Sequence, residues 1–237
     1  MTAQKTNFDS SRISGLAPMS TASVDYSFEC GATKRRQSYL KVGKRLFDIA
    51  FVLAVIPFIL PLVGIAAALL AMEGGRPFYW QHRVGREGRV FSMMKLRSMV
   101  PNADQMLDSY LASNPAARRE WNEKQKLTND PRITRLGSIL RKTSLDELPQ
   151  FWNVLIGEMS VVGPRPMMVD QQDLYPGTAY YTVRPGITGL WQISRRNTTS
   201  FASRTHFDAY YCRTVSLKKD LQIIIRTAFV MVRGTGC

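Results

Sequence analysis

The chain has 237 residues, 45% of them hydrophobic, which is enough for one large domain or a medium domain with appendages. Thirty-two Lys and Arg against 18 Asp and Glu give a formal net charge of +14, which indicates an anionic partner such as nucleic acid, acidic lipid headgroups or a phosphorylated substrate. Cys30, Cys212 and Cys237 are odd in number and widely spaced, which fits neither a disulfide framework nor a zinc knuckle and suits a reducing compartment.

Residues 1–40 are predicted to form a flexible N-terminal arm. The first 38 residues are rich in Ser, Thr, Ala and Gly and show no sustained apolar period. They also lack the apolar core and cleavage site of a secretory signal. The arm ends in basic residues at positions 34–36, which form a basic collar together with Lys41, Lys44 and Arg45.

Residues 47–72 are apolar except for Asp48, and at about 1.5 Å per helical residue they could cross a bilayer. Pro57 and Pro61 near the middle predict a kink. Basic residues flank both ends, and the positive-inside rule would place both ends on the cytoplasmic side. Residues 41–75 are therefore predicted to be a re-entrant membrane element, a helix–break–helix that enters and leaves one leaflet. A buried helix of a soluble core is the alternative.

Residues 76–237 are predicted to form a small, mostly helical α/β domain with interfacial amphipathic helices. We expect strands at 77–79, 90–94 and 190–193, a helical segment at 103–127 with a break near residue 114, and a helix at 133–141. The terminal segment, 217–232, is strongly apolar with basic residues near its start. It is predicted to lie in the membrane interface or, equally well, to be buried as a terminal helix.

Asp146 and Glu147 form an acid pair directly after two cations, Arg141 and Lys142. One interpretation is that Asp146 attacks a phosphorus atom while nearby arginines hold the phosphate. The structural alternative is a capping box, because residues 144–147 match the S-x-x-E pattern in which Glu147 satisfies a backbone N–H at a helix start. Pro149 argues against the cap, because it would fall past the first helical turn.

Three basic positions outside the acid pair are candidate anion ligands. Arg165 lies between two prolines on a stiff loop, and its planar fork matches phosphate oxygens. Lys95 follows a predicted strand and could meet headgroups or a phosphate, although such charges are usually solvated. Arg196 lies in a stretch whose composition alone indicates a basic loop.

Taken together, these blocks resemble the bacterial sugar transferases, the monotopic phosphoglycosyl transferases that initiate exopolysaccharide and glycan assembly. The likeness covers residues 41–232 and is nearest to the initiating transferases of rhizobial exopolysaccharide. The matching stretches, in the order of the family, are 44–48, 81–85, 95–99, 140–150, 153–160, 163–166, 184–189 and 196–197. Two positions depart from the pattern: Leu60 stands before Pro61 where the family usually has Ser, and Arg195 stands where it often has Gly.

The resemblance implies that the chain transfers a sugar-1-phosphate from UDP-galactose or UDP-glucose to undecaprenyl phosphate and releases UMP. Asp146 would be the nucleophile that forms a covalent phospho-sugar intermediate, and Glu147 would assist. The family needs Mg²⁺, for which Asp146 and Glu147 are the candidate ligands. Lys95, Arg141, Arg165 and Arg196 would bind the substrate phosphates.

The resemblance also implies a location and partners. The protein would be monotopic in the bacterial inner membrane, in contact with lipid, with its catalytic domain on the cytoplasmic face. Its oligomeric state stays open, and a homo-oligomer is compatible with everything above. Rival interpretations are a non-catalytic, membrane-anchored protein of polysaccharide assembly and a binder of anionic lipid or nucleic acid. No recognised nucleic-acid module is present, so we expect no nucleic-acid partner.

Overall fold

The computed structural model describes residues 34–124, 127–194, 201 and 203–232. Most of the predicted arm and the predicted phosphate ligand Arg196 lie outside these ranges. The described chain is mostly helical with two small two-stranded sheets, which confirms the predicted α/β class. The helices are α1 (Lys34–Ser38), α2 (Lys44–Met72), α3 (Ala103–Ser113), α4 (Pro115–Lys124), α5 (Arg135–Lys142), α6 (Gln150–Ile156), α7 (Ala179–Thr182), α8 (Leu190–Ile193), α9 (Arg204–Thr214) and α10 (Leu217–Val232).

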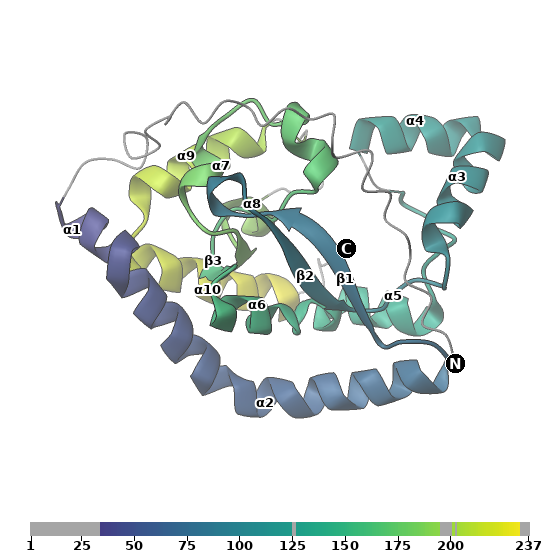
Figure 1. Cartoon of the computed structure of the whole chain (residues 1–237), viewed down its shortest axis with the longest axis horizontal. Helices are drawn as coiled ribbons and strands as arrows, with labels where there is room; N and C mark the ends of the chain where they lie inside the picture. The colour runs from purple at the N-terminus through teal and green to yellow at the C-terminus, as the bar shows by residue number, and fades with distance from the viewer. Residues whose placement is uncertain (1–33, 125–126, 195–200, 202, 233–237) are drawn as a thin grey trace.

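The long apolar segment is a continuous helix rather than two helices with a break. A π-helical turn, η3 (Tyr39–Gly43), leads directly into α2, and both Pro57 and Pro61 lie inside that helix. The two prolines are four residues apart, so they share one face and their lost hydrogen bonds fall on one side. The helix therefore bends without being interrupted, and Figure 1 shows the bend near its middle.

Both ends of α2 pack against the rest of the chain. Near the start, Asp48 is 0% exposed and accepts a hydrogen bond from the backbone N–H of Val161 at 3.0 Å. Near the end, Leu70 is buried, and its carbonyl accepts a hydrogen bond from Nη2 of Arg97 at 2.9 Å. The middle is uncovered, with Phe58 74% exposed.

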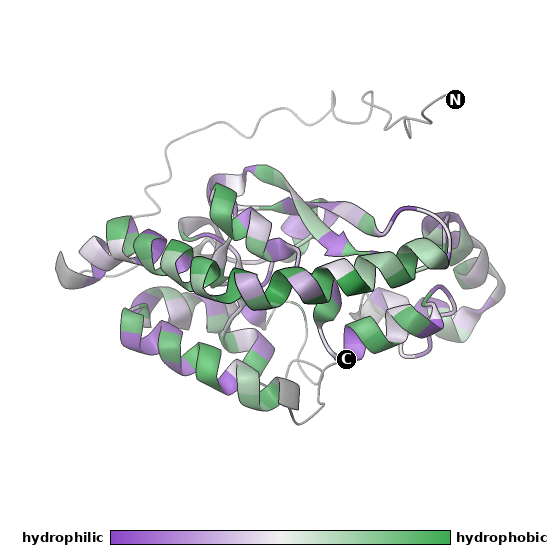
Figure 2. Cartoon of the chain, turned by 90° about the horizontal axis from the view of Figure 1, so that it is seen from below, coloured by the Kyte–Doolittle hydropathy of each residue, from purple (hydrophilic) through white to green (hydrophobic). Residues whose placement is uncertain are grey.

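Within the described residues, Arg36–Met72 is the one helical stretch long and apolar enough to cross a membrane by length and composition. Only a small share of its apolar window is buried, which argues against the alternative of a soluble-core helix. Figure 2 shows the helix crossing one face of the molecule with hydrophobic colour along most of its length. Further exposed apolar side chains lie on α5, α6 and α10, namely Ile139, Trp152, Ile156, Leu221, Ile225 and Phe229.

The terminal helix α10 is buried on one face and exposed on the other. Asp220 and Ile223 are buried against the domain, while Ile225 and Phe229 are exposed. Asp220 accepts hydrogen bonds from Nζ of Lys44 and the hydroxyls of Tyr39 and Tyr211, each at 2.8 Å. This buried network joins α2, α9 and α10.

The two sheets carry the segments that surround the acid pair. Strands β1 (Phe78–Val84) and β2 (Val90–Leu96) form an antiparallel hairpin around the short helix η4 (Arg86–Gly88), and both strands are longer than predicted. Strands β3 (Ser160–Val162) and β4 (Gly186–Thr188) pair in parallel. The main core lies among α2, α6, α9, α10 and these two short strands.

The strand predicted at 190–193 is wrong, because these residues form the short helix α8. A four-residue apolar run carries too little periodicity to separate a buried strand from a buried turn of helix. The helical segment predicted at 103–127 is confirmed as α3 and α4, which meet at Asn114 and Pro115 as expected.

Candidate active site

The acid pair lies on a single 3₁₀ turn, η5 (Leu145–Glu147), between α5 and α6. The capping-box alternative is wrong: Ser144 has a left-handed backbone conformation, with φ of 56°, and its side chain makes no capping hydrogen bond. Pro149 directly precedes α6, where a missing backbone N–H has little cost because the first N–H groups of a helix have no partner within it.

Asp146 is a buried carboxylate among cations. Its exposed fraction is 8%. Burial raises its pKa from 3.8 to about 6 and the charge of Glu147 adds to the rise, while Lys95, Arg141 and Arg165 oppose it. The group is therefore mostly ionised at neutral pH, yet it is poorly solvated. A carboxylate in this condition is a better nucleophile than a fully hydrated one.

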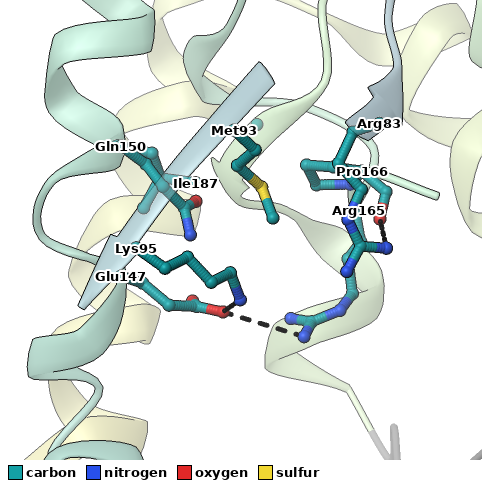
Figure 3. Close-up of a pocket in the computed structure, with 9 residues that line it drawn as sticks. Arg83, Met93, Lys95, Glu147, Gln150, Arg165, Pro166 and Ile187 are labelled. Atoms are coloured by element: carbon teal, nitrogen blue, oxygen red, sulfur yellow. Dashed lines mark hydrogen bonds and ion pairs between the residues drawn. The ribbon is translucent and has the colours of Figure 1, made fainter. Parts of the chain in front are cut away.

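Glu147 lies between two of the predicted phosphate ligands. Its Oε1 is 3.1 Å from Nζ of Lys95 on β2 and 3.8 Å from Nη2 of Arg165 on the loop after β3. Figure 3 shows both cations converging on this carboxylate from different sides. The fold thus brings Lys95, 52 positions before Glu147, and Arg165, 18 positions after it, to the same carboxylate.

Arg141 is a further cation near the acid pair. It projects from the last turn of α5, and its Nε donates to Oγ of Ser98 at 2.8 Å. Burial lowers its pKa, and the charges of Asp146 and Asp130 oppose that effect. Three of the four predicted cations, Lys95, Arg141 and Arg165, thus lie within electrostatic range of Asp146; the fourth, Arg196, lies outside the described residues.

The sequence interpretation missed Arg83, which lines the same pocket as Lys95 and Arg165. Its Nη2 donates to Oε1 of Gln81 at 2.6 Å, and its Nη1 lies 3.4 Å from the carbonyl of Pro166. Burial lowers its pKa to about 10, with the charge of Arg165 contributing. A longer predicted strand would have revealed it, because Gln81 pairs with Met93 and alternation then places residue 83 on the face of Lys95.

Arg204 was also missed, and it holds the loop that carries Arg165. Its Nη2 donates to the carbonyl of Arg165 at 3.1 Å, and its guanidinium stacks over Trp191 at 4.7 Å. Its pKa is lowered to about 10 by burial and by the neighbouring charge of Arg165. Nothing local in the sequence singles out this arginine; its role depends on the packing of α9 against α8.

Close backbone packing fixes the other side of the same loop. A Cβ on Gly163 would lie 2.4 Å from the carbonyl oxygen of Arg184, and one on Gly186 would lie 2.1 Å from the backbone nitrogen of Gly163. Neither position leaves room for a side chain. The loop is thus held against β4 on one side and by Arg204 on the other, which makes Arg165 a preorganised cation.

The acid pair fits a magnesium ion only in company with the substrate. Among the described residues, no group of three or more His, Cys, Asp or Glu side chains is placed to hold a metal. Asp146 and Glu147 offer one carboxylate each. Mg²⁺ is commonly bound by one or two carboxylates together with substrate phosphates and water, so this donor set is compatible with the ion that the resemblance implies.

Comparison with known proteins gives the same family as the sequence motifs. The family described as Bacterial sugar transferase matches residues 39–234. The chain is 47% identical over 195 residues to a UDP-galactose-lipid carrier transferase of Erwinia amylovora, covering 81% of this chain and 41% of that protein. It is 44% identical over 199 residues to the exopolysaccharide production protein ExoY of Sinorhizobium fredii, covering 82% and 88%.

A third relative adds to these two. The undecaprenyl-phosphate galactose phosphotransferase of Salmonella typhimurium is 43% identical over 205 residues, which is 86% of this chain and 42% of that protein. The chain thus spans about two fifths of the Erwinia and Salmonella relatives and most of ExoY. Because the family matches most of its length and the alignment with ExoY covers 88% of that protein, the chain belongs to the bacterial sugar transferase family.

Proposed function

We propose that the protein transfers a sugar-1-phosphate from a UDP-sugar to undecaprenyl phosphate, with UMP as the leaving product, as a first step of exopolysaccharide synthesis. The observation that carries this proposal is the buried carboxylate of Asp146, surrounded by Lys95, Arg141 and Arg165. Phosphoryl transfer depends chiefly on positioning and on cations that stabilise the phosphate oxygens. The relatives named for UDP-galactose and undecaprenyl phosphate support the same chemistry.

The proposed reaction has two displacements at one phosphorus atom. An oxygen of Asp146 attacks the sugar-bearing phosphorus of the donor, the bond to the bridging oxygen breaks, and UMP leaves with that oxygen. A phosphate oxygen of undecaprenyl phosphate then attacks the same phosphorus, the bond to the carboxylate breaks, and the product is a diphosphate-linked lipid. Asp146 regains its charge, and ping-pong kinetics follow.

The neighbouring side chains have distinct parts in this scheme. Arg165 and Lys95 balance the phosphate charge, while Glu147 holds both cations in place at 3.8 and 3.1 Å before the substrate binds. A bound Mg²⁺, held by Asp146 and Glu147 with substrate phosphates, would supply further charge neutralisation at the diphosphate. Arg141 adds positive charge near Asp146 and is fixed by its hydrogen bond to Ser98.

The membrane placement forms part of the proposal. We propose that the protein is monotopic in the inner membrane, with α2 entering and leaving one leaflet and the domain on the cytoplasmic face. The contacts of both ends of α2 with the same domain support this, because a straight span would carry one end about 30 Å away. The exposed apolar side chains of α5, α6 and α10 would then meet the lipid interface.

The test is UMP release from UDP-galactose and UDP-glucose in the presence of undecaprenyl phosphate and Mg²⁺. Wild type should release UMP, and Asp146→Asn should abolish release while the protein stays folded and in the membrane fraction. The exposed Asp173→Asn is the matched control and should keep full activity. A radiolabelled sugar-phosphate should become bound to wild type and map to residue 146.

The outcomes separate this proposal from the non-catalytic alternative. Release of UMP by wild type rules out a protein that only anchors or binds. Near-normal turnover of Asp146→Asn, or an adduct on another side chain, would refute the assignment of the nucleophile. Competition between the two donors in the same assay identifies the sugar, for which the relatives named for galactose favour UDP-galactose.

A further inference from the structure

Gln150 is a buried side chain with an unused hydrogen-bond donor beside the acid pair. It is the first residue of α6, four positions after Asp146, and is 2% exposed. Its Nε2 is buried and has no hydrogen-bond partner in the described structure. A buried amide without a partner loses its hydrogen bonds to water with nothing in exchange, so its presence at this place requires an explanation.

The surroundings of this amide indicate what the partner is. Gln150 lines a pocket together with three cations, Arg83, Lys95 and Arg165, and one acid, Glu147. The net charge of these four side chains is therefore positive before any ligand binds. Figure 3 shows the amide of Gln150 pointing into the space toward which these groups converge.

The remaining walls of the pocket are mostly apolar. Met93, Pro166 and Ile187 are apolar, so they lower the local polarity and strengthen interactions with charge. Arg83 has a buried Nε that, like the Gln150 amide, has no hydrogen-bond partner in the described structure. The unpaired donors Nε2 of Gln150 and Nε of Arg83, together with the excess of positive charge, suit a ligand with several charged acceptor oxygens.

From this arrangement we infer that Gln150 donates a hydrogen bond from Nε2 to a phosphate oxygen of the substrate, in a subsite that Arg83 and Arg165 complete. This inference rests on the proposed function, in which both the donor and the acceptor carry phosphate groups. The amide recognises the oxygen without adding charge, whereas the arginines supply the charge. Gln150 is thus a substrate-contacting residue distinct from the acid pair and the basic residues predicted from sequence.

The first experiment measures stability and activity of Gln150→Met, which keeps the length and removes the donor. Loss of an unpaired buried donor should leave the melting temperature unchanged or raise it. Loss of a bond to a charged oxygen should lower kcat/KM by about 10- to 100-fold. Gln150→Glu, of the same shape but negative, should lower it further. Exposed Gln105→Met is the control and should match wild type.

A structural role for Gln150 predicts the opposite pattern in Gln150→Met. The melting temperature would then fall, and activity would fall only with the folded fraction. That pattern overturns the inference, as does activity of Gln150→Met within twofold of wild type. A wild type that releases no UMP refutes the proposed function instead.

The two half-reactions assign the source of the phosphate. A lower kcat/KM for the UDP-sugar alone assigns the donor diphosphate to this subsite, and a lower value for undecaprenyl phosphate alone assigns the acceptor phosphate. A lower kcat/KM for both substrates shows that the subsite binds a phosphate of the donor in the first step and of the acceptor in the second. Independently of turnover, thermal stabilisation by inorganic pyrophosphate should be present in wild type and reduced in Gln150→Met; equal stabilisation of both counts against the inference.

Discussion

Replacement of Asp146 by Asn should make the protein more stable while it abolishes turnover, and the gain should depend on pH. The structure buries this carboxylate and raises its pKa from 3.8 to about 6. Each pKa unit corresponds to about 1.4 kcal/mol, so keeping the group ionised in the fold costs about 3 kcal/mol. Asn has nearly the same shape and avoids that cost.

The sign of the pH dependence follows from the raised pKa. Below pH 3.8 the carboxyl is protonated in both the folded and the unfolded chain, so it has no cost. As the pH rises the unfolded chain ionises first, and the cost grows until the folded group ionises near pH 6. The advantage of Asp146→Asn should therefore be small near pH 4 and complete above about pH 7.

The assay is thermal unfolding of both proteins in the same detergent from pH 4 to 8. For a chain of this size 1 kcal/mol corresponds to about 2–4 °C, so a difference of about 6–12 °C should separate the variants at pH 8. Asp173→Asn should follow wild type at every pH. A difference that does not change with pH, or a less stable Asp146→Asn at pH 8, would show that the surrounding cations outweigh burial and would refute the reasoning.

Three further predictions use other features. The kcat/KM for UMP release should fall about tenfold per pH unit below pH 6, because a protonated Asp146 cannot attack phosphorus; a flat profile from pH 5 to 8 contradicts this. Lys44→Met should cost about 3–5 kcal/mol by leaving Asp220 as an uncompensated buried charge, and adding Asp220→Asn should recover part of the loss in thermal unfolding. Tags at Met1 and Cys237 should both report the cytoplasmic side of the membrane, and opposite sides would exclude the monotopic arrangement.

The acid pair and its nearest cations could be predicted from the sequence because each carries a local signal. Asp146 and Glu147 are adjacent, Lys95 directly follows an apolar run, and Arg165 lies between prolines that restrict its loop. The structure places both Lys95 and Arg165 beside Glu147. Adjacency in the chain and a proline-restricted loop can both be read directly from the sequence.

The missed residues depend on partners that are distant in sequence. Arg204 acts through Trp191 and the carbonyl of Arg165, both reached only when α9 packs on α8. Gln150 looks like an ordinary helix start until the cations of β1 and β2 are placed beside it. Such roles follow from tertiary register, which composition and periodicity do not specify.

The two errors in the fold have a common cause. Residues 190–193 were too few for a period to separate strand from helix, and the prolines of α2 were expected to interrupt a helix that only bends. In both places the prediction used only the local conformational preference of the residues and took no account of tertiary packing. Tertiary contacts at both ends of α2 keep the helix continuous where an isolated peptide would fray.

The burial of Asp48 and Leu70 has a consequence for how the protein can be handled. Asp48 accepts hydrogen bonds from Ser160 and Val161 of β3, and Leu70 packs with Leu96 of β2 and Leu140 of α5. The two ends of α2 therefore belong to the packing of the domain. A shortened chain beginning after residue 75 would expose that packing surface to water and lose the partner of Val161. The long apolar helix α2 is therefore a structural part of the fold, and excising it to obtain a water-soluble fragment should yield aggregated protein.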